Sequence, residues 1–282
     1  MERIENISEM QSRAGMIRKS GLRIGFVPTM GYLHQGHLSL IYAAKKVSDV
    51  VVVSIFVNPA QFGPNEDYNT YPRDISRDEK LAEEAGADII FHPSACDMYP
   101  GKHFTWVYVE KLTEILCGAK RKGHFRGVTT VVSKLFHIVK PHTAVFGQKD
   151  AQQAAVIKKM VDDLNMDVTI HIAPTVREAD GLAMSSRNVF LTPENRKNAS
   201  ILSTVLFRLK ASVLSGEDIN TLLEKAKKSI SQLPDTEVEY IELRSYPDLE
   251  PMARFDRDCL IALAVRFGGV RLIDNVFIEK TS

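Results

Sequence analysis

Cysteine is scarce in this sequence of 282 residues. The three that occur, Cys96, Cys117 and Cys259, stand far apart and show no Cys-x-x-Cys spacing. An odd number at such separations argues against a disulfide framework and a structural zinc site, and it fits a reducing compartment. Because a free cysteine usually packs like a small apolar residue, we expect all three to be buried.

Long apolar runs are also missing. The longest, residues 50–57, is interrupted by Ser54 and is far too short to span a bilayer. The first twenty residues lack the apolar segment of a secretory signal. We therefore expect a cytoplasmic protein with no membrane partner.

Neither sign of charge predominates. Lys and Arg number 36 and Asp and Glu number 35, which leaves a formal net charge of +1. Such a balance produces no field that favours nucleic acid as a partner, so any anion site must be built locally. The composition, 44% hydrophobic and 25% charged, is ordinary for a soluble globular protein, and the length suffices for one large or two modest domains.

The first half of the chain alternates short β-branched runs with longer amphipathic stretches. This alternation predicts βαβ units and an α/β fold with a doubly wound parallel sheet, whose ligands bind at the carboxyl ends of the strands. The N-terminus carries apolar residues at helical spacing, namely Ile4, Ile7, Met10 and Ile17. The expected strands cover residues 22–27, 50–57, 88–92, 143–146 and 168–172, and the expected helices cover residues 37–48, 74–85, 127–140 and 149–164.

The second half has a different pattern. Two helical stretches, residues 193–214 and 218–233, precede strand-like runs at residues 238–243, 259–265 and 270–275. We expect a smaller C-terminal α+β domain here. The boundary is expected between residues 175 and 184, which gives domains 1–175 and 176–282.

The most informative segment is FVPTMGYLHQGHLSLI, residues 26–41. It predicts a strand end, a tight loop and a helix start, where free N–H groups and the positive end of the helix dipole favour a phosphate. Gly31 and Gly36 allow the close backbone approach that a phosphate requires. His34 and His37 are three residues apart, so within one helical turn they share a side and can donate hydrogen bonds to phosphate oxygens.

Other interpretations of the paired histidines remain open at this point. A histidine at a helix start can be a simple cap or a surface residue. A zinc site would need a third ligand, and none stands at metal-ligand spacing. The dinucleotide fingerprint GxGxxG is absent from this turn, which argues against an NAD enzyme.

Polar residues follow two further expected strands. Asn58 and Gln61, in FVNPAQF, offer amide donors and acceptors that suit a hydroxy acid, although an Asn-Pro pair also suits a plain turn. In FGQKD, Lys149 suits a phosphate, and Asp150 can bind a ribose hydroxyl or cap the helix. A surface position is the alternative for both. Arg126, in HFRG, can reach a phosphate or form a surface salt bridge.

The HxGH string after a first strand resembles the nucleotidyltransferase superfamily, which includes class I aminoacyl-tRNA synthetases. The wider string PTMGYLHQGH resembles the pantothenate synthetase family within it. Four more segments agree in order, so that the resemblance covers nearly the whole chain: IFVNPAQFGPNEDYNTYPR, KGHFRGVTTVVSKLF, FGQKDAQQ and READGLAMSSRN.

The AMSSRN segment matches the KMSKS-type loop of that superfamily. Ala183 stands where the synthetases carry lysine, which is the pantothenate synthetase form of the loop. Ser185 and Ser186 would donate hydroxyls, and Arg187 would fork onto phosphate oxygens.

The resemblance implies a Rossmann-like domain that binds nucleotide and pantoate, and a C-terminal lid domain. Pantoate and β-alanine would be bound by Met30, Asn58, Gln61 and Gln153. The residues implied for catalysis are His37, His34, Lys149, Ser185, Ser186 and Arg187. The residues implied for ATP are Met30, Gly31, Tyr32, Leu33, His34, Gln35, Gly36, His37, Gly147, Gln148, Lys149, Asp150, Val176, Met184, Ser185, Ser186 and Arg187.

The implied reaction is the ATP-dependent condensation of pantoate with β-alanine through a pantoyl adenylate, with release of pyrophosphate and AMP. A Mg²⁺ ion is expected with the ATP, with protein ligands that the sequence does not reveal. A homodimer is implied by the resemblance as well. The alternatives are a nucleotidyltransferase for another small substrate, which would require more basic residues near the strand at 50–57, and a non-catalytic nucleotide sensor.

Overall fold

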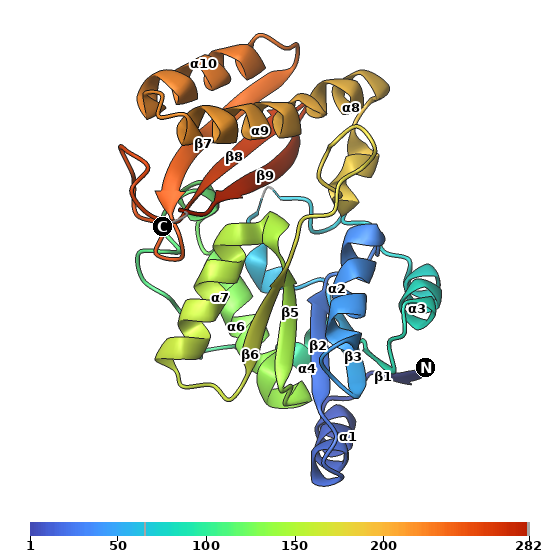
Figure 1. Ribbon diagram of the computed structural model, residues 1–282. Helices are drawn as coiled ribbons and strands as arrows, with labels where there is room; N and C mark the ends of the chain where they lie inside the picture. The colour runs from blue at the N-terminus through green and yellow to red at the C-terminus, as the bar shows by residue number, and fades with distance from the viewer. Residues whose placement is uncertain (65, 281–282) are drawn as a thin grey trace. The chain divides into compact units, whose positions relative to one another are not determined.

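The structure, a computed structural model, describes residues 1–64 and 66–280 (Figure 1). The chain forms two compact units. The first contains residues 1–147 and 156–174, and the second contains residues 148–155 and 175–282. The binding and lid roles expected for domains 1–175 and 176–282 stay predictions.

The first unit is built on a parallel sheet of six strands in the order β1-β4-β3-β2-β5-β6. Every neighbouring pair is parallel, so the α/β prediction is confirmed. From β2 the chain proceeds to β3 on one side, whereas β5 lies on the other, and the strand order therefore reverses between β2 and β5. The strands are β1 Glu2–Ile4, β2 Ile24–Thr29, β3 Val50–Ile55, β4 Ile89–Phe91, β5 Thr143–Gly147 and β6 Thr169–Ala173.

Helices cover both faces of this sheet, which explains why β3 is almost entirely buried and is apolar apart from Ser54 (Figure 1). On one face Leu38 and Ile41 of α2 pack with Val53 and Ile90 of the sheet. The helices of this unit are α1 Ile7–Lys19, α2 Gln35–Lys45, α3 Ile75–Glu84, α4 Ala95–Met98, α5 Cys117–Lys120 and α6 His124–Val139, with the short 3-10 helix η1 Pro59–Gln61. Helix α7, Ala151–Asp163, begins in the second unit and continues in the first.

The second unit is a three-stranded antiparallel sheet in the order β7-β8-β9, with α9 and α10 packed on one face (Figure 1). Leu202 and Leu206 of α9 share its core with Leu263 of β8. The smaller α+β unit is therefore confirmed. Its elements are η2 Gln148–Asp150, η3 Ser186–Phe190, α8 Pro193–Ala199, α9 Ile201–Leu214, α10 Ile219–Ser231, β7 Thr236–Ser245, β8 Cys259–Phe267 and β9 Val270–Ile278.

Three local predictions were wrong. Ile4 belongs to β1 and not to the N-terminal helix, because the Asn6 side chain accepts the N–H groups of Ser8 and Glu9 and starts α1 at Ile7. The stretch 193–214 is two helices, separated at Ser200. Cys96 is exposed, whereas Cys117 and Cys259 are buried as expected, and all three cysteines are free.

The described part of the chain contains no helix that is long and apolar enough to cross a membrane.

Candidate active site

The paired histidines form the start of α2. His34 is the N-cap residue, in an extended conformation, and its Nδ1 accepts the N–H of Gly36 at 3.1 Å. His37, three residues on, returns the contact, since its Nδ1 accepts the N–H of His34 at 3.4 Å. The two rings lie side by side with their centroids 4.1 Å apart. The helix thus begins two residues earlier than the expected His37, and the expected pairing of the imidazoles is present.

This capping arrangement fixes which ring nitrogen carries the hydrogen. Because Nδ1 of each ring uses its lone pair to accept a backbone N–H, the neutral tautomer has its hydrogen on Nε2. In that tautomer both imidazoles carry an N–H group at Nε2, and both stand at one helix start. That is the donor set that stabilises charge on phosphate oxygens.

The loop before α2 is held by a buried carboxylate that the sequence analysis did not identify. Asp78, in α3, accepts the N–H of Tyr32 at 2.6 Å and the N–H of Leu33 at 2.7 Å. Tyr32 has a positive φ of 51°, and Gly31 has a φ of 86°. A Cβ on Gly31 would lie 2.9 Å from Asp78 Oδ2, so only glycine fits this approach.

Asp78 is 1% exposed. Burial raises the pKa of its carboxyl group, and the hydrogen bonds from Leu33 and Tyr32 oppose that rise. The Arg77 guanidinium lies 3.6 Å from Asp78 and 4.9 Å from the centre of the Tyr32 ring. A sequence signal for Asp78 did exist, because it stands four residues before the buried Ala82 on the apolar side of an otherwise charged helix.

The second strand-end site lies beyond β3. The Nδ2 group of Asn58 donates to Gln61 Oε1 at 3.0 Å, and Gln61 Nε2 lies 3.0 Å from the sulfur of Met30. The carboxyl ends of β2 and β3 thus meet here, as parallel neighbours must. The structure brings Met30, Asn58 and Gln61 together, as the sequence predicted.

Helix α6 packs against η1, the segment that carries Gln61. Gly127 packs so closely on η1 that a Cβ would lie 2.2 Å from the carbonyl oxygen of Ala60. His124 Nδ1 is hydrogen-bonded to the backbone carbonyl of Gln61 at 2.8 Å. Arg121 contacts the other nitrogen of His124 at 2.9 Å and binds Glu66 through two guanidinium nitrogens.

Burial pushes the pKa of Glu66 up, but the hydrogen bonds and charge of Arg121 outweigh that effect and hold it below its usual range. Arg126, for which a phosphate contact or a salt bridge was considered, has its guanidinium 4.6 Å from the centre of the Trp106 ring.

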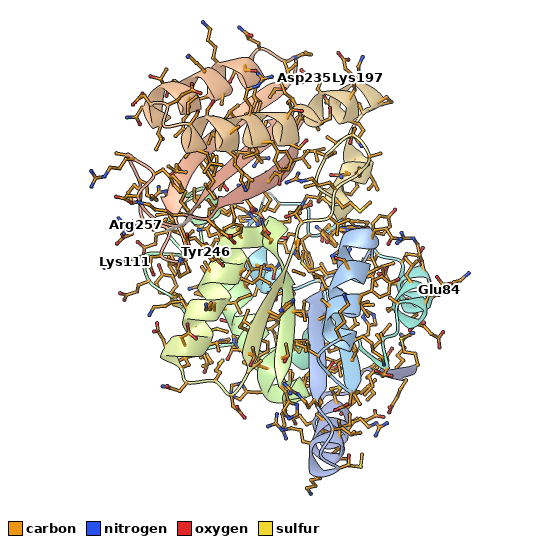
Figure 2. All side chains as sticks on the ribbon, viewed as in Figure 1. Glu84, Lys111, Lys197, Asp235, Tyr246 and Arg257 are labelled. Carbon is orange, nitrogen blue, oxygen red and sulfur yellow. The ribbon has the colours of Figure 1, made fainter. Side chains whose placement is uncertain are left out.

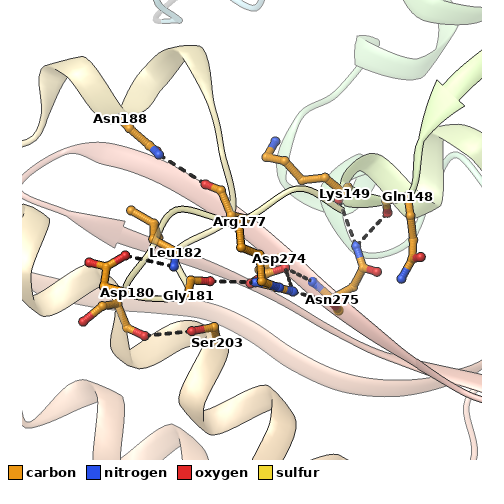
Figure 3. Close-up of polar contacts among 12 residues, drawn as sticks. Gln148, Lys149, Arg177, Asp180, Gly181, Leu182, Asn188, Ser203, Asp274 and Asn275 are labelled. Carbon is orange, nitrogen blue, oxygen red and sulfur yellow. Dashed lines mark hydrogen bonds and ion pairs between the residues drawn. The ribbon is translucent and has the colours of Figure 1, made fainter. Parts of the chain in front are cut away.

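Apart from Gly147, which ends β5 in the first unit, the remaining candidate residues lie in the second unit, where β9 contacts two loops. Asn275 Nδ2 donates to the backbone carbonyls of Gln148 and Lys149, both at 2.9 Å (Figure 3). Lys149 Nζ lies 3.7 Å from Asp150. Asn275 therefore holds the FGQKD segment through its backbone. The Lys149 side chain takes no part in these two hydrogen bonds.

The loop 175–190 is anchored by Asp274, the residue of β9 that precedes Asn275. The Asp274 carboxylate accepts hydrogen bonds from both terminal nitrogens of Arg177, at 2.6 and 3.0 Å (Figure 3). Arg177 also donates to the carbonyl of Gly181 at 3.1 Å. The N–H of Met184 donates to the carbonyl of Val176 at 3.0 Å, so these two predicted residues are neighbours.

Ser185 caps the 3-10 helix η3, because its Oγ accepts the N–H of Arg187 at 3.3 Å. Ser186 is buried. Asp274 is 2% exposed and lies on the same face of β9 as the buried Leu272 and Val276. An acidic residue at this inward position of an apolar strand was the signal that the sequence analysis missed.

Comparison with known proteins identifies the family. A family model described as pantoate-beta-alanine ligase matches residues 2–277. The chain belongs to this family. It is 55% identical to the pantothenate synthetase of Pelotomaculum thermopropionicum over 275 residues, which cover 97% of this chain and 98% of that protein. It is 54% identical to the pantothenate synthetase of Acetivibrio thermocellus over 283 residues, which cover 99% of this chain and all of the relative.

Solved structures of pantoate-beta-alanine ligases share the fold. The pantothenate synthetase of Thermus thermophilus matches with a TM-score of 0.91 and 42% identity, over 98% of this chain and 99% of that chain. The pantoate-beta-alanine ligase of Francisella tularensis, described as complexed with beta-gamma ATP and beta-alanine, matches with a TM-score of 0.82 and 37% identity, over 98% and 97% of the two chains. The resemblance inferred from the motifs is thus confirmed.

The individual residue roles expected of a pantoate-beta-alanine ligase stay predictions. Within the first unit the structure groups His34 with His37, and Met30 with Asn58 and Gln61. Gln153 lies in the first turn of α7, in the stretch that belongs to the second unit. Among the described residues no three His, Cys, Asp or Glu side chains gather into a metal-binding group.

Proposed function

We propose that this chain condenses pantoate with β-alanine at the expense of ATP and forms pantothenate through a pantoyl adenylate. One observation supports the proposal within the fold: a single short segment, residues 30–37, which runs from the end of β2 into the first turn of α2, carries two kinds of candidate side chain. Its end carries the imidazoles of His34 and His37, whose Nδ1 atoms accept backbone N–H groups, and its beginning places Met30 against the Gln61 amide. A phosphate and a small hydroxy acid bound by one loop would have their reacting atoms close together.

The proposed chemistry needs no protein nucleophile. A carboxylate oxygen of pantoate attacks the α-phosphorus of ATP, the bond to the β-phosphate oxygen breaks, and pyrophosphate leaves with the electron pair. The deprotonated amine of β-alanine then attacks the acyl carbon, the bond from that carbon to the AMP oxygen breaks, and the nitrogen loses a proton to solvent. The protein's part is to position the reactants and to stabilise charge on the phosphates, for which His34, His37, Lys149, Ser185, Ser186 and Arg187 are proposed.

A nucleotidyltransferase for another substrate is less well supported. A phosphorylated substrate would require cations at the end of β3, and the side chains there are the amides of Asn58 and Gln61, joined by Met30. A non-catalytic sensor is disfavoured because the chain keeps both histidines, Lys149 and the Ser-Ser-Arg loop.

Magnesium is proposed as the partner of ATP. Mg²⁺ bound to a nucleotide keeps several waters and takes much of its coordination from phosphate oxygens. The described residues hold no group of three candidate ligands. We therefore assign the ion no protein ligand and no step of its own.

We also propose that the chain forms a homodimer and works in the cytoplasm. Support for the dimer is an aromatic stripe made of Phe104, Trp106 and Tyr108, which are 83%, 38% and 50% exposed. They occupy every second position of a segment whose Val107 backbone is hydrogen-bonded to the hydroxyls of two threonines in α6. A fixed, exposed aromatic row suits association with another protein surface. Support for the cytoplasm is that all three cysteines are free, one of them exposed.

Isotope exchange tests the proposed reaction. Labelled pyrophosphate should enter ATP when the protein, Mg²⁺ and pantoate are present and β-alanine is absent, because the first half-reaction is reversible by itself. Omission of pantoate should abolish the exchange. Oxygen-18 from the pantoate carboxylate should appear in AMP after a full turnover. ADP and phosphate as products would reject the adenylate mechanism.

A further inference from the structure

The side chain of Asn58 has all its hydrogen-bonding capacity filled by the protein. Its Oδ1 accepts the N–H of Ala60 at 3.2 Å and the hydroxyl of Tyr99 at 2.9 Å. Its Nδ2 donates to the carbonyl of Gly127 at 3.1 Å and to Gln61 Oε1 at 3.0 Å. An asparagine amide has two donors and two acceptor sites, and Asn58 is 1% exposed. It therefore has no group left with which to contact a substrate directly.

These partners also determine which way each amide faces. A backbone N–H can only donate and a backbone carbonyl can only accept, so the contacts with Ala60 and Gly127 fix the oxygen and nitrogen of Asn58. The Gln61 atom that faces Asn58 Nδ2 must then be its oxygen. The Gln61 nitrogen consequently points to Met30, whose thioether sulfur is a weak acceptor that a substrate oxygen can replace.

We propose that Tyr99 and Asn58 are positioning residues, which orient the Gln61 amide so that its NH₂ group, and not its carbonyl, faces the substrate. The site then selects a substrate that presents an oxygen acceptor, a hydroxyl or a carboxylate, at this point. It rejects one that presents an ammonium or another N–H donor there, because two donors would face each other. This inference rests on the proposed function only for the identity of the acid.

Tyr99 is the first donor in this series of hydrogen bonds, which runs from its hydroxyl through Asn58 to Gln61. Burial raises the pKa of its phenol to about 12, against the opposing effect of the hydrogen bond to Asn58, so the hydroxyl keeps its proton at neutral pH. The ring contacts Phe56, at a centroid distance of 6.5 Å, and His103, at 5.0 Å. Lys134 Nζ lies 5.3 Å from the ring centre.

Tyr99→Phe tests the proposal with the least disturbance. It removes one hydroxyl and should raise the KM for pantoate roughly 3- to 10-fold, the effect expected for one lost hydrogen bond, with little change in the KM for ATP. Tyr42→Phe is the control, because it also removes a tyrosine hydroxyl, from an exposed residue of α2 that belongs neither to the Asn58 contacts nor to the aromatic stripe. It should leave the pantoate KM unchanged.

A double-mutant cycle separates positioning from general damage. If Tyr99 acts through Gln61, Tyr99→Phe should change the pantoate KM, or its Kd by calorimetry, less than about twofold in a Gln61→Ala background. The same fold-change in both backgrounds would overturn the proposal. Asn58→Asp should be worse than Tyr99→Phe, with at least a roughly tenfold loss, because a carboxylate cannot donate to Gln61 and would turn its amide round.

An activity-independent measurement distinguishes this inference from the proposed function. The side-chain NH₂ protons of Asn58, assigned by their loss in Asn58→Asp, should exchange slowly with solvent in the wild type and faster in Tyr99→Phe. Equal, fast exchange in both proteins would overturn the inference even if pantoate is the substrate. Slow exchange without any turnover of pantoate would instead reject the proposed function and leave the amide orientation standing.

Discussion

His34 and His37 each use Nδ1 to accept a backbone N–H, so their chemistry toward a ligand is that of Nε2. The capping contacts that begin α2 and the proposed phosphate contacts thus use opposite nitrogens of the same rings. A residue that replaces either histidine changes the helix start and the ligand contact together, and the two effects are separable because capping affects stability whereas the donor affects rate.

His37→Ala should lower the rate of adenylate formation by roughly 10²–10³, the usual cost of removing one transition-state donor, in a protein that stays folded. Pyrophosphate exchange and circular dichroism measure the two effects. His137→Ala, which changes an exposed histidine on α6, is the control. A turnover close to that of the wild type at saturating substrates would exclude this role for His37.

Asp78→Asn should impair the same loop from a distance. An asparagine oxygen can accept one of the two N–H groups of Tyr32 and Leu33, but its NH₂ group would face the other, so pyrophosphate exchange should fall at least roughly tenfold. Glu84→Gln, on the outer side of the same helix, is the control (Figure 2). Unaltered exchange in Asp78→Asn would mean that the loop does not depend on this carboxylate.

The raised pKa of Asp78 gives this variant a second signature. A carboxyl group whose pKa is higher in the folded than in the unfolded state contributes stability below the unfolded pKa and loses it as the pH rises through the folded pKa. The difference in unfolding free energy between wild type and Asp78→Asn should therefore move against the wild type from acidic to neutral pH. Urea titrations at several pH values measure it, and a difference that is independent of pH would contradict this sign.

The pairing of His34 with His37 could be predicted from the sequence, because residues three apart at a helix start lie on one side of the helix. The support of Asp78 was not readable in the same way. Its contacts join residues 45 and 46 positions apart, and they depend on how α3 packs beside the loop. The same holds for Tyr99, which reaches Asn58 across 41 positions.

Elements were predictable where periodicity was long and strong, as for β3, α6 and β9. They were not where tertiary pairing creates them. β1 has three residues and exists because Arg3 pairs with Ile90 of β4, a partner that local pattern cannot reveal. Helices α4 and α5 have four residues each, too few for a periodic signal.

The contact between α6 and η1 provides a test at the level of elements. Gly127→Ala would place a Cβ 2.2 Å from the Ala60 carbonyl, so the helix must move away from the segment that carries Gln61. Overpacking of this kind should cost about 1–3 kcal/mol of unfolding free energy and also raise the pantoate KM. Gly15→Ala in α1, where nothing lies within 4 Å of the new Cβ, should be neutral or slightly stabilising. Equal stability of the two variants in urea would contradict the close packing.

At the scale of the whole molecule, the prediction of an α/β part followed by a smaller α+β part is confirmed by strand order in both sheets. The sequence did not show that residues 148–155 group with the second unit. That grouping arises because Asn275 binds the carbonyls of Gln148 and Lys149, more than a hundred residues away along the chain.

The proposed homodimer has a direct test on the aromatic stripe. The wild type should show a mass in solution of twice 31.6 kDa by light scattering, and the Phe104→Ser, Tyr108→Ser double variant should shift toward the monomer. Met16→Ser, which changes a comparably exposed apolar residue on α1, should leave the mass unchanged. A monomeric wild type, or a double variant that stays dimeric, would reject this surface as the interface.

Because β9 anchors the segments around Gln148 and Arg177, the order of synthesis affects when these segments can fold. A ribosome releases the chain from its N-terminus, and N-terminal parts generally fold first. Every strand of the parallel sheet has emerged before β9 is synthesised, so Met30, Asn58 and Gln61 can assemble early. The Gln148–Lys149 segment and Arg177 must wait for Asn275 and Asp274. A nascent chain interrupted before β9 would therefore have Met30, Asn58 and Gln61 assembled, while the segments around Gln148 and Arg177 remained unanchored.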